Sequence, residues 1–323
     1  MIMPTKFAAI DIGSNSSLLL ILEAGEDRVA RVVIDTKFST KLSSGTQFGD
    51  AISAAALQRQ YAALDKFAVI LNQHRINNVV ACGTQVFRVA ANGGQIAEEI
   101  SRRYGWRMDI ISGEREAQLS FQAAATGLQG IAGERTVMDV GGGSSEVIVG
   151  DGERIAFSHS FPVGAVSLTE RFELEAKGHD SACIDAATSY LKELFQAKQL
   201  PLQLAKSAGP KRCVIAVGGT AATLAALKLE QKIFVPKSIH GVELSKAWIQ
   251  EKIVKLFILD REERRGLLPF DPDRADIIVG GALIIECLLE RLESESLIVS
   301  NCGLRWGLIS DAFAQLKGVR IEQ

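Results

Sequence analysis

Two short segments rich in glycine and serine, each led by an aspartate, hold the residues best suited to chemistry in this chain of 323 residues. The first reads Asp11-Ile-Gly-Ser-Asn-Ser-Ser-Leu-Leu-Leu-Ile, and the second reads Asp139-Val-Gly-Gly-Gly-Ser-Ser-Glu-Val-Ile-Val. They align without gaps at an offset of 128 residues, from 11 to 139, and four of the eleven positions are identical. Such a repeat indicates a duplicated architecture, and the alternative is a chance likeness of two turns.

Turns of this composition suit phosphate binding, because several backbone N–H groups can converge on one point and form a concave anion site. The residues that would form the two sites are Gly13, Ser14, Asn15 and Ser16, and Gly141, Gly142, Gly143 and Ser144. Facing each other across a cleft, the two turns would hold a di- or polyphosphate. A third candidate is Gly218-Gly219-Thr220 at the expected start of a helix, whose N-terminus favours an anion.

Three carboxylates stand where they could bind a divalent cation. Asp11 and Asp139 each end a predicted strand before a turn, and Glu146 lies seven residues beyond Asp139 on the returning strand. Carboxylate oxygens are preferred ligands of Mg²⁺, and phosphate chemistry uses that ion to neutralise the transferring group. The alternatives are an aspartate that caps its own turn and, for Glu146, an exposed strand carboxylate.

Three other charged residues remain open on pattern alone. Glu114 and Glu116 fall in the first turn of a predicted helix, where the helix dipole favours carboxylates whatever their function. Arg88 lies six residues after a predicted strand end at Cys82, so it is either a solvated helix residue or one directed at the phosphates. No Ser-His-Asp arrangement or nucleophile elbow is present, which argues against hydrolysis through an acyl-enzyme.

The elements that would position these residues alternate between strands and helices. Each repeat reads as strand, turn, antiparallel strand and third strand, the third strands being expected at 28–33 and 154–159. Apolar residues at spacings of three and four predict a helix over 54–71, and Ser112 is the expected N-cap of a helix that reaches 125. Further helices are predicted at 88–104, 181–199, from 218 and at 274–290, and further strands at 78–82, 108–111, 213–217 and 297–299.

Composition limits the class of protein. An apolar content of 47% and a charged content of 23% are typical of a globular protein and exclude disorder. The net charge of −2 argues against a nucleic-acid partner. Five scattered cysteines without a Cys-x-x-Cys pair favour reduced thiols, and no apolar run approaches the ~20 residues of a membrane span, so we expect a cytoplasmic protein.

Several motifs together resemble the exopolyphosphatase/guanosine pentaphosphatase (Ppx/GppA) family of the sugar kinase, Hsp70 and actin superfamily. The most specific are the two aspartate segments, Gly83-Thr-Gln-Val-Phe-Arg88, and Ile111-Ser-Gly-Glu-Arg-Glu116-Ala. Val217-Gly-Gly-Thr220, Pro272-Asp-Arg-Ala-Asp276 and Gly303-Leu-Arg305 support the likeness, which covers nearly the whole chain.

The resemblance implies an α/β fold with two ribonuclease-H-like (actin-like ATPase) lobes, each a mixed sheet with flanking helices, around a central cleft. The expected lobes are residues 1–130 with a C-terminal helix at 304–323, and residues 131–303. A homodimer is also expected from the resemblance.

The resemblance also implies roles for single residues. Glu116 matches the family's general base, which activates water for attack on a terminal phosphorus, and Arg88 matches an arginine that contacts the phosphate. Thr84 joins the phosphate-binding residues. Asp11, Asp139 and Glu146 are the expected ligands of Mg²⁺ or Mn²⁺.

Three departures from the family pattern bear on activity. Arg115 stands where a glutamate usually precedes the Glu-Ala pair, and Asn301 and Trp306 stand where two carboxylates are frequent. The leading hypothesis is a Mg²⁺-dependent phosphohydrolase that releases the terminal phosphate of inorganic polyphosphate or of guanosine pentaphosphate, with basic residues gathered at the cleft. The alternatives are a weakly catalytic or non-catalytic sensor of alarmone or polyphosphate, which the departures suggest, and an ATP-dependent small-molecule kinase.

Overall fold

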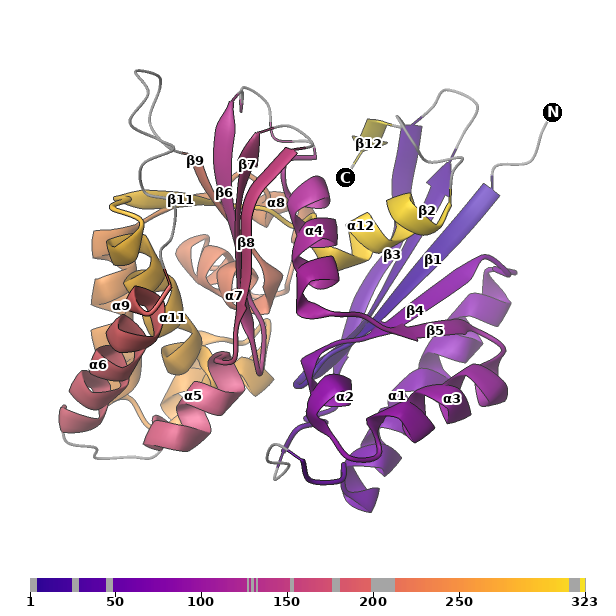
Figure 1. Cartoon of the computed structure of the whole chain (residues 1–323), viewed down its shortest axis with the longest axis horizontal. Coiled ribbons are helices and arrows are strands. Elements are labelled where there is room, and N and C mark those ends of the chain that lie inside the picture. The colour runs from indigo at the N-terminus through magenta and orange to yellow at the C-terminus, as the bar shows by residue number, and fades with distance from the viewer. Residues whose placement is uncertain are drawn as a thin grey trace. The chain divides into compact units, whose positions relative to one another are not determined.

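The chain folds as two compact units, residues 1–127 with 302–323 and residues 128–301. The computed structural model describes residues 5–24, 29–44, 49–126, 128, 131, 133–151, 154–175, 181–198, 213–313 and 320–322. The boundary expected at residue 130 lies outside the described residues. Each unit contains one six-stranded mixed sheet with helices, which confirms the predicted α/β class (Figure 1).

The sheet of the first unit has the strand order β12-β3-β2-β1-β4-β5. Its strands are β1 (Thr5–Ile12), β2 (Ser16–Ala24), β3 (Val29–Ser39), β4 (Val79–Gly83), β5 (Arg107–Ile110) and β12 (Arg320–Glu322). The first three form an antiparallel meander, whereas β4 lies parallel to β1 and β5 lies parallel to β4. Parallel pairing places the ends of β1 and β4 at one edge, where the first aspartate turn also lies.

Helices cover both faces of this sheet (Figure 1). They are α1 (Ala54–Gln73), α2 (Gln85–Val89), α3 (Gly93–Tyr104), α4 (Gly113–Ala124) and α12 (Leu304–Ala312). The core on one face contains Ile10 and residues of α1, α2 and α3, and the core on the other contains Ala9 and residues of α4 and α12. Because side chains alternate along a strand, Asp11 belongs to the face of Ala9 and α4.

Two predicted helices of the first unit are wrong in extent. The helix expected at 88–104 is two helices, because the backbone becomes extended at Ala90. The side chain of Asn92 then accepts from the N–H of Ile52 at 2.8 Å and donates to its C=O at 3.2 Å. The helix expected at 304–323 ends at Ala312, and residues 320–322 form β12 along the edge of β3. A glycine followed by β-branched Val319 and Ile321 disfavours helix in that segment.

The second unit repeats the meander on its own sheet, in the order β10-β11-β9-β6-β7-β8. Its strands are β6 (Glu134–Val140), β7 (Ser145–Asp151), β8 (Arg154–Phe161), β9 (Cys213–Val217), β10 (Glu243–Ser245) and β11 (Ser296–Val299). Strands β6, β7 and β8 are antiparallel, and β9 lies parallel to β6. The second aspartate turn therefore lies at the edge where β6 and β9 end.

The helices of this unit are α5 (Ala165–Phe172), α6 (Ala182–Gln196), α7 (Gly218–Lys228), α8 (Pro236–Ile239), α9 (Lys246–Ile258), α10 (Arg261–Leu267) and α11 (Ile278–Arg291), with a 3₁₀ turn at Pro272–Asp276. One core joins Met138 and Val140 of the sheet to α5, α6, α7, α9 and α11. The predicted start of a helix at Arg274 is wrong, because residues 272–276 form the 3₁₀ turn and α11 begins at Ile278. In the part of the chain that the structure describes, no helix has the length and apolar character needed to cross a bilayer.

Candidate active site

The predicted site residues fall into two groups, one in each unit. The first unit holds Asp11, Gly13, Ser14, Asn15, Ser16, Thr84, Arg88 and Glu116. The second holds Asp139, Gly141, Gly142, Gly143, Ser144, Glu146, Gly218, Gly219 and Thr220.

The two aspartate turns close with the same hydrogen bond. The N–H of Gly13 donates to the carbonyl of Ser16 at 3.0 Å, and the N–H of Gly141 donates to the carbonyl of Ser144 at 3.0 Å. The aligned residues of the sequence repeat therefore have the same local structure.

In the second unit, the first turn of α5 holds the aspartate turn. The carbonyl of Gly141 accepts from the N–H of Ala165 at 2.9 Å, and the carbonyl of Gly142 accepts from the N–H of Val166 at 2.8 Å. Because C=O and N–H point in opposite directions across a trans peptide, the N–H groups that follow these carbonyls, on Gly142 and Gly143, point away from α5. Within the described residues neither N–H has a backbone acceptor, so both are available to an anion.

Glycine at position 164 permits this arrangement. A Cβ atom there would lie 2.5 Å from the carbonyl carbon of Gly142 and 2.5 Å from the nitrogen of Gly143. Real Cβ atoms do not approach backbone so closely, so any side chain at this position would displace the turn.

In the first unit, an irregular segment holds the turn instead of a helix. The carbonyl of Ser14 accepts from the N–H of Ser43 at 3.0 Å and from its hydroxyl at 3.2 Å. The carbonyl of Asn15 accepts from the N–H groups of Thr40 and Lys41 at 3.0 and 2.9 Å. Lys41 has a φ of 46°, a left-handed conformation that costs energy for a residue with a side chain.

A Gly-Thr segment lies beside the turn in the first unit. Gly83 pairs with Ile12, and the N–H of Thr84 donates to the carbonyl of Ile12 at 3.3 Å. The hydroxyl oxygen of Thr84 is 3.8 Å from where a Cβ of Gly13 would lie, so this predicted phosphate-binding residue is next to the turn.

A matching segment lies beside the aspartate in the second unit. Val217 pairs with Asp139, and α7 begins at Gly218, whose φ is 85°. A Cβ on Gly218 would lie 2.4 Å from Oδ1 of Asp139, so the close approach and the positive φ both require glycine. Thr220 donates a hydrogen bond of 3.5 Å to the carbonyl of Val140.

The predicted metal ligands of the second unit face each other across two strands. Asp139 pairs directly with Glu146, so both side chains lie on one face of the sheet, where opposite Cβ atoms are about 5 Å apart. Glu146 is 1% exposed and accepts a hydrogen bond of 2.6 Å from the hydroxyl of Ser160. In the first unit the same register places apolar Leu18 opposite Asp11. Among the described residues no three His, Cys, Asp or Glu side chains form a metal-binding group.

Glu116 and Arg88 form a shielded ion pair in the first unit. Ser112 caps α4 by accepting from the N–H of Arg115 at 3.2 Å, and Glu116 lies in the first turn of that helix. Arg88 donates from Nη1 to Oε2 of Glu116 at 2.9 Å and to the carbonyl of Ile111 at 2.8 Å. Glu116 is 8% exposed, in contrast to the exposed Glu114, so the helix dipole alone does not account for it.

Cys82 shows that these charges share one neighbourhood with Asp11. Burial raises the pKa of the Cys82 thiol well above its ordinary value, and the carboxylates of Asp11 and Glu116 raise it further, while Arg88 opposes them. Asp11 and Cys82 are also direct neighbours in the sheet. Near the ends of β1 and β4, the first unit therefore gathers the carboxylates of Asp11, Glu116 and Asp109 with the guanidinium of Arg88.

Comparison with known proteins shows the family of this chain. The pattern of the Ppx/GppA phosphatase family matches residues 21–315. The chain belongs to this family. Exopolyphosphatase 2 of Mycobacterium tuberculosis is 30% identical over 312 residues, which cover 90% of this chain and 92% of that protein.

Two other relatives extend the comparison. The guanosine-5′-triphosphate,3′-diphosphate pyrophosphatase of Vibrio atlanticus is 29% identical over 94% of this chain and 59% of its own length. The crystal structure of the Aquifex aeolicus Ppx/GppA member superimposes with a TM-score of 0.75 at 27% identity, covering 95% of this chain and 97% of that one. The chain is thus a phosphoric anhydride hydrolase with the two-lobed, actin-like fold of the Ppx/GppA enzymes.

The three departures from the Ppx/GppA pattern have contacts that the structure describes. Arg115 donates to Gln118 at 2.6 Å and forms an ion pair with Asp311 of α12 at 2.5 Å. Trp306 is 1% exposed in the core beneath α4 and α12. The backbone N–H of Asn301 donates to Nδ1 of His240 at 3.3 Å.

One residue outside the predicted site lies against a predicted phosphate loop. A Cβ on Gly219 would lie 1.7 Å from Nη2 of Arg274, so the guanidinium group rests directly on the start of α7. Arg274 is 8% exposed, and its Nε is 3.6 Å from the carboxylate of Asp271. Burial lowers the pKa of Arg274, although Asp271 partly opposes this. The motif Pro272–Asp276 marks this arginine in the sequence, but its 55-residue separation from Gly219 hides the contact.

Proposed function

We propose that this chain releases the terminal phosphate of inorganic polyphosphate, or the 5′-γ-phosphate of guanosine pentaphosphate, by Mg²⁺-assisted attack of water with Glu116 as general base. The named activities of the mycobacterial and Vibrio relatives support these two substrate classes. Both substrates present a terminal phosphoryl group on a phosphoanhydride chain, so one site can serve both.

The ion pair of Glu116 and Arg88 carries the proposal. A general base must be held at a fixed position, and the 2.9 Å bond from Arg88 holds the carboxylate of Glu116 in place. The guanidinium also brings positive charge to the place where a phosphoryl group would meet the activated water. Glu116 would take the proton of the water as its oxygen attacks phosphorus, and the shortened phosphate chain would leave.

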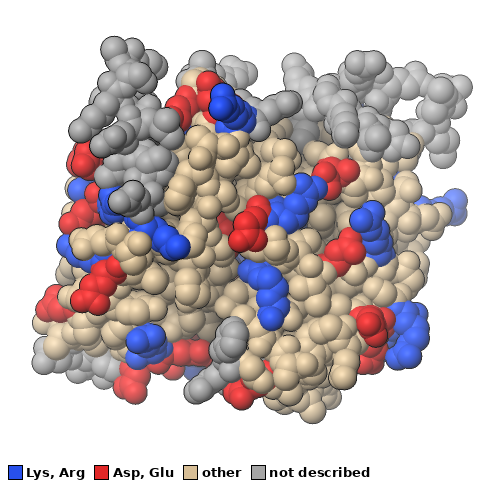
Figure 2. Space-filling model, viewed as in Figure 1, with Lys and Arg blue, Asp and Glu red and all other residues tan. Residues whose placement is uncertain are grey.

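Each of the two turns would bind phosphate oxygens. In the second unit the N–H groups of Gly142 and Gly143 face away from α5, and Arg274 adds a cation at Gly219. In the first unit Thr84 lies beside Gly13. Figure 2 shows basic and acidic residues interspersed on the face in view, so the gathering of basic residues at the substrate stays a prediction.

The residues of the second unit fit a magnesium ion. Mg²⁺ in phosphate-handling enzymes takes one or two protein carboxylates and completes its shell with water and phosphate oxygens, so a group of three acids is not required. The directly opposed carboxylates of Asp139 and Glu146 match that demand, and Asp11 is the candidate in the first unit. When bound, the ion would neutralise charge on the transferring phosphoryl group. Mn²⁺ could replace it, and the homodimer and the cytoplasmic location remain predictions.

A substrate panel tests the proposal. Phosphate release would be measured with short polyphosphate, long polyphosphate, guanosine pentaphosphate and ATP in the presence of Mg²⁺, with Glu116→Gln beside the wild type. We expect release from a polyphosphate or from guanosine pentaphosphate, lost in the variant. Tight binding of polyphosphate and guanosine pentaphosphate without phosphate release would favour a sensor. Transfer of phosphate from ATP to a small acceptor would favour a kinase.

A further inference from the structure

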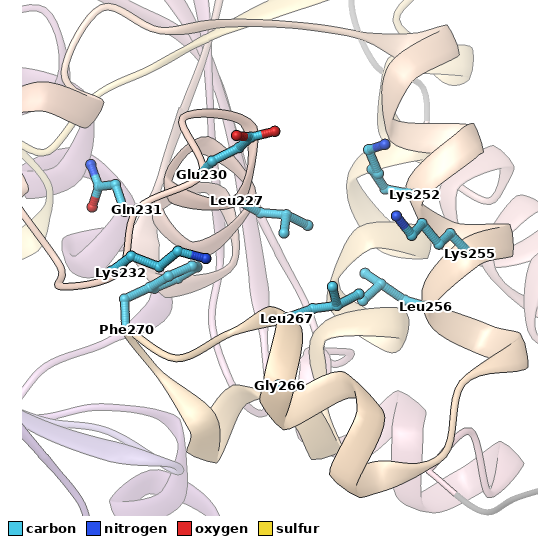
Figure 3. A pocket seen from close by; sticks show the side chains of 10 residues that line it. All are labelled: Leu227, Glu230, Gln231, Lys232, Lys252, Lys255, Leu256, Gly266, Leu267 and Phe270. Carbon is cyan, nitrogen blue, oxygen red and sulfur yellow. The ribbon is translucent and has the colours of Figure 1, made fainter.

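A pocket of about 350 Å³ lies within the second unit, where the C-terminal end of α7 meets α9 and α10 (Figure 3). It is lined by Leu227, Glu230, Gln231, Lys232, Lys252, Lys255, Leu256, Gly266, Leu267 and Phe270. None of these residues belongs to the proposed catalytic or phosphate-binding set. Its volume is near the lower end of the range for small organic ligands.

Four of the lining side chains are apolar, and we call them the floor of the pocket. They are Leu227, Leu256, Leu267 and Phe270. The ring of Phe270 is supported by Phe234, with ring centroids 6.5 Å apart and planes inclined by 30°. An apolar surface with a fixed aromatic ring favours the planar, apolar part of a ligand.

Three ammonium groups surround this floor. Lys252 and Lys255 are three residues apart on α9, and Lys232 reaches the pocket from the opposite side, over Phe270 (Figure 3). Lys252 also pairs with Glu251 at 2.6 Å, whereas the described residues contain no ion pair of Lys232 or Lys255. Glu230 is the only acid among the lining residues, so the lining itself carries a net +2, of which the charge of Lys252 is offset by Glu251 outside the lining.

We propose that this pocket binds a small organic phosphate with a planar apolar body, of the class of a nucleoside monophosphate, apart from the catalytic residues. The planar body lies on Phe270 and the leucines, and the phosphate dianion lies between Lys232 and Lys255. Lysine suits this task because its ammonium is a compact charge that can bind phosphate from several directions. The bound dianion offsets the mutual repulsion of the ammonium groups.

Calorimetric titration of the full chain with AMP, adenosine and inorganic phosphate tests the inference. AMP has no phosphoanhydride, so binding is separated from turnover. We expect AMP to bind, and adenosine and phosphate to bind at least roughly tenfold more weakly, because each supplies one half of the contacts. Absence of AMP binding would overturn the proposal, whether or not the chain hydrolyses polyphosphate.

Matched variants assign the binding to this pocket. Lys232→Met and Lys255→Met should each weaken AMP binding by roughly three- to tenfold, whereas Glu230→Gln should strengthen it by a few fold because a repelling carboxylate is lost. All three should keep the wild-type rate of phosphate release in the absence of AMP. If the Lys232→Met/Lys255→Met double variant bound AMP as tightly as the wild type, the ligand would lie elsewhere and the proposal would be refuted. Displacement of AMP by tripolyphosphate in the Glu116→Gln variant would have the same meaning.

Discussion

The two aspartate turns share their closing hydrogen bond but differ in what holds them and in what faces them. The turn of the second unit rests on the first turn of α5, whereas that of the first unit rests on the irregular segment 40–43. Position 18 of the first repeat is leucine, and the aligned position of the second is Glu146. The two repeats therefore share a backbone structure but differ in the side chains that could do chemistry.

This difference suggests that the units divide the work. Under the proposed function, the first unit would activate water through Glu116 and its partner Arg88. The second unit would hold a cation through the opposed carboxylates of Asp139 and Glu146. Variants in the two units should therefore fail in different ways.

The largest effect is expected for Glu116→Gln in the first unit. Loss of the general base should lower kcat by about 10²–10⁴-fold, and because the defect is in proton transfer, excess Mg²⁺ should not restore the rate. The rate of phosphate release at increasing Mg²⁺ concentration tests both the loss of kcat and the lack of rescue, and thermal unfolding is the control for folding. A rate within a few fold of wild type would remove Glu116 from the role of base.

Glu146→Gln in the second unit should fail in the opposite way. Removal of one of two opposed carboxylates should raise the Mg²⁺ concentration for half-maximal activity by about 10–100-fold, and saturating Mg²⁺ should recover most of the rate. Leu18→Gln at the aligned position of the first unit is the matched control and should leave the Mg²⁺ dependence unchanged. If both variants shift it equally, the two units do not divide the work in this way.

Arg274→Lys should raise KM by roughly tenfold while it changes kcat less, because lysine keeps the charge but loses the planar fork that rests on Gly219. Initial rates over a range of substrate concentration separate the two parameters. A fall in unfolding temperature with unchanged KM would instead assign Arg274 a structural role only.

Local patterns in the sequence predicted the scaffold well. Ser112 as N-cap of α4 and the strand Cys213–Val217 followed from residues adjacent in the chain, and the structure confirms both. The long helix at 88–104 could not be divided by the same reasoning, because its break depends on Asn92 bonding Ile52, forty residues earlier.

The site was harder to predict from the sequence than the scaffold, because it too depends on contacts between residues far apart in the chain. Pattern alone left Glu116 as one of two carboxylates at a helix start, and only the resemblance separated it from Glu114. The fold makes the distinction through Arg88, which reaches Glu116 across 28 residues. The contact of Arg274 with Gly219 likewise depends on packing between distant segments.

A smaller effect, on stability, should distinguish how the two turns are held. Gly164→Ala forces a Cβ to within 2.5 Å of the turn backbone and should lower the free energy of unfolding by about 1–3 kcal/mol. A Cβ at Gly13 would come no closer than 3.3 Å, to the carbonyl oxygen of Ser16, so the cost of Gly13→Ala should be smaller. Urea denaturation of both variants measures the difference. A larger loss for Gly13→Ala would show that the second turn adapts more easily than its contacts imply.

The smallest effect is expected for Ser43→Ala, which tests the irregular segment that holds the first turn. The hydroxyl donates to the carbonyl of Ser14 at 3.2 Å, but the backbone N–H of the same residue donates to that carbonyl at 3.0 Å and is retained. Loss of the weaker donor should cost about 0.5–1.5 kcal/mol of unfolding free energy and leave kcat and KM unchanged. Urea denaturation and steady-state kinetics on one preparation measure both. A fall of tenfold or more in kcat/KM without loss of stability would mean that the hydroxyl contacts the substrate, and segment 40–43 would then belong to the site and not only to its support.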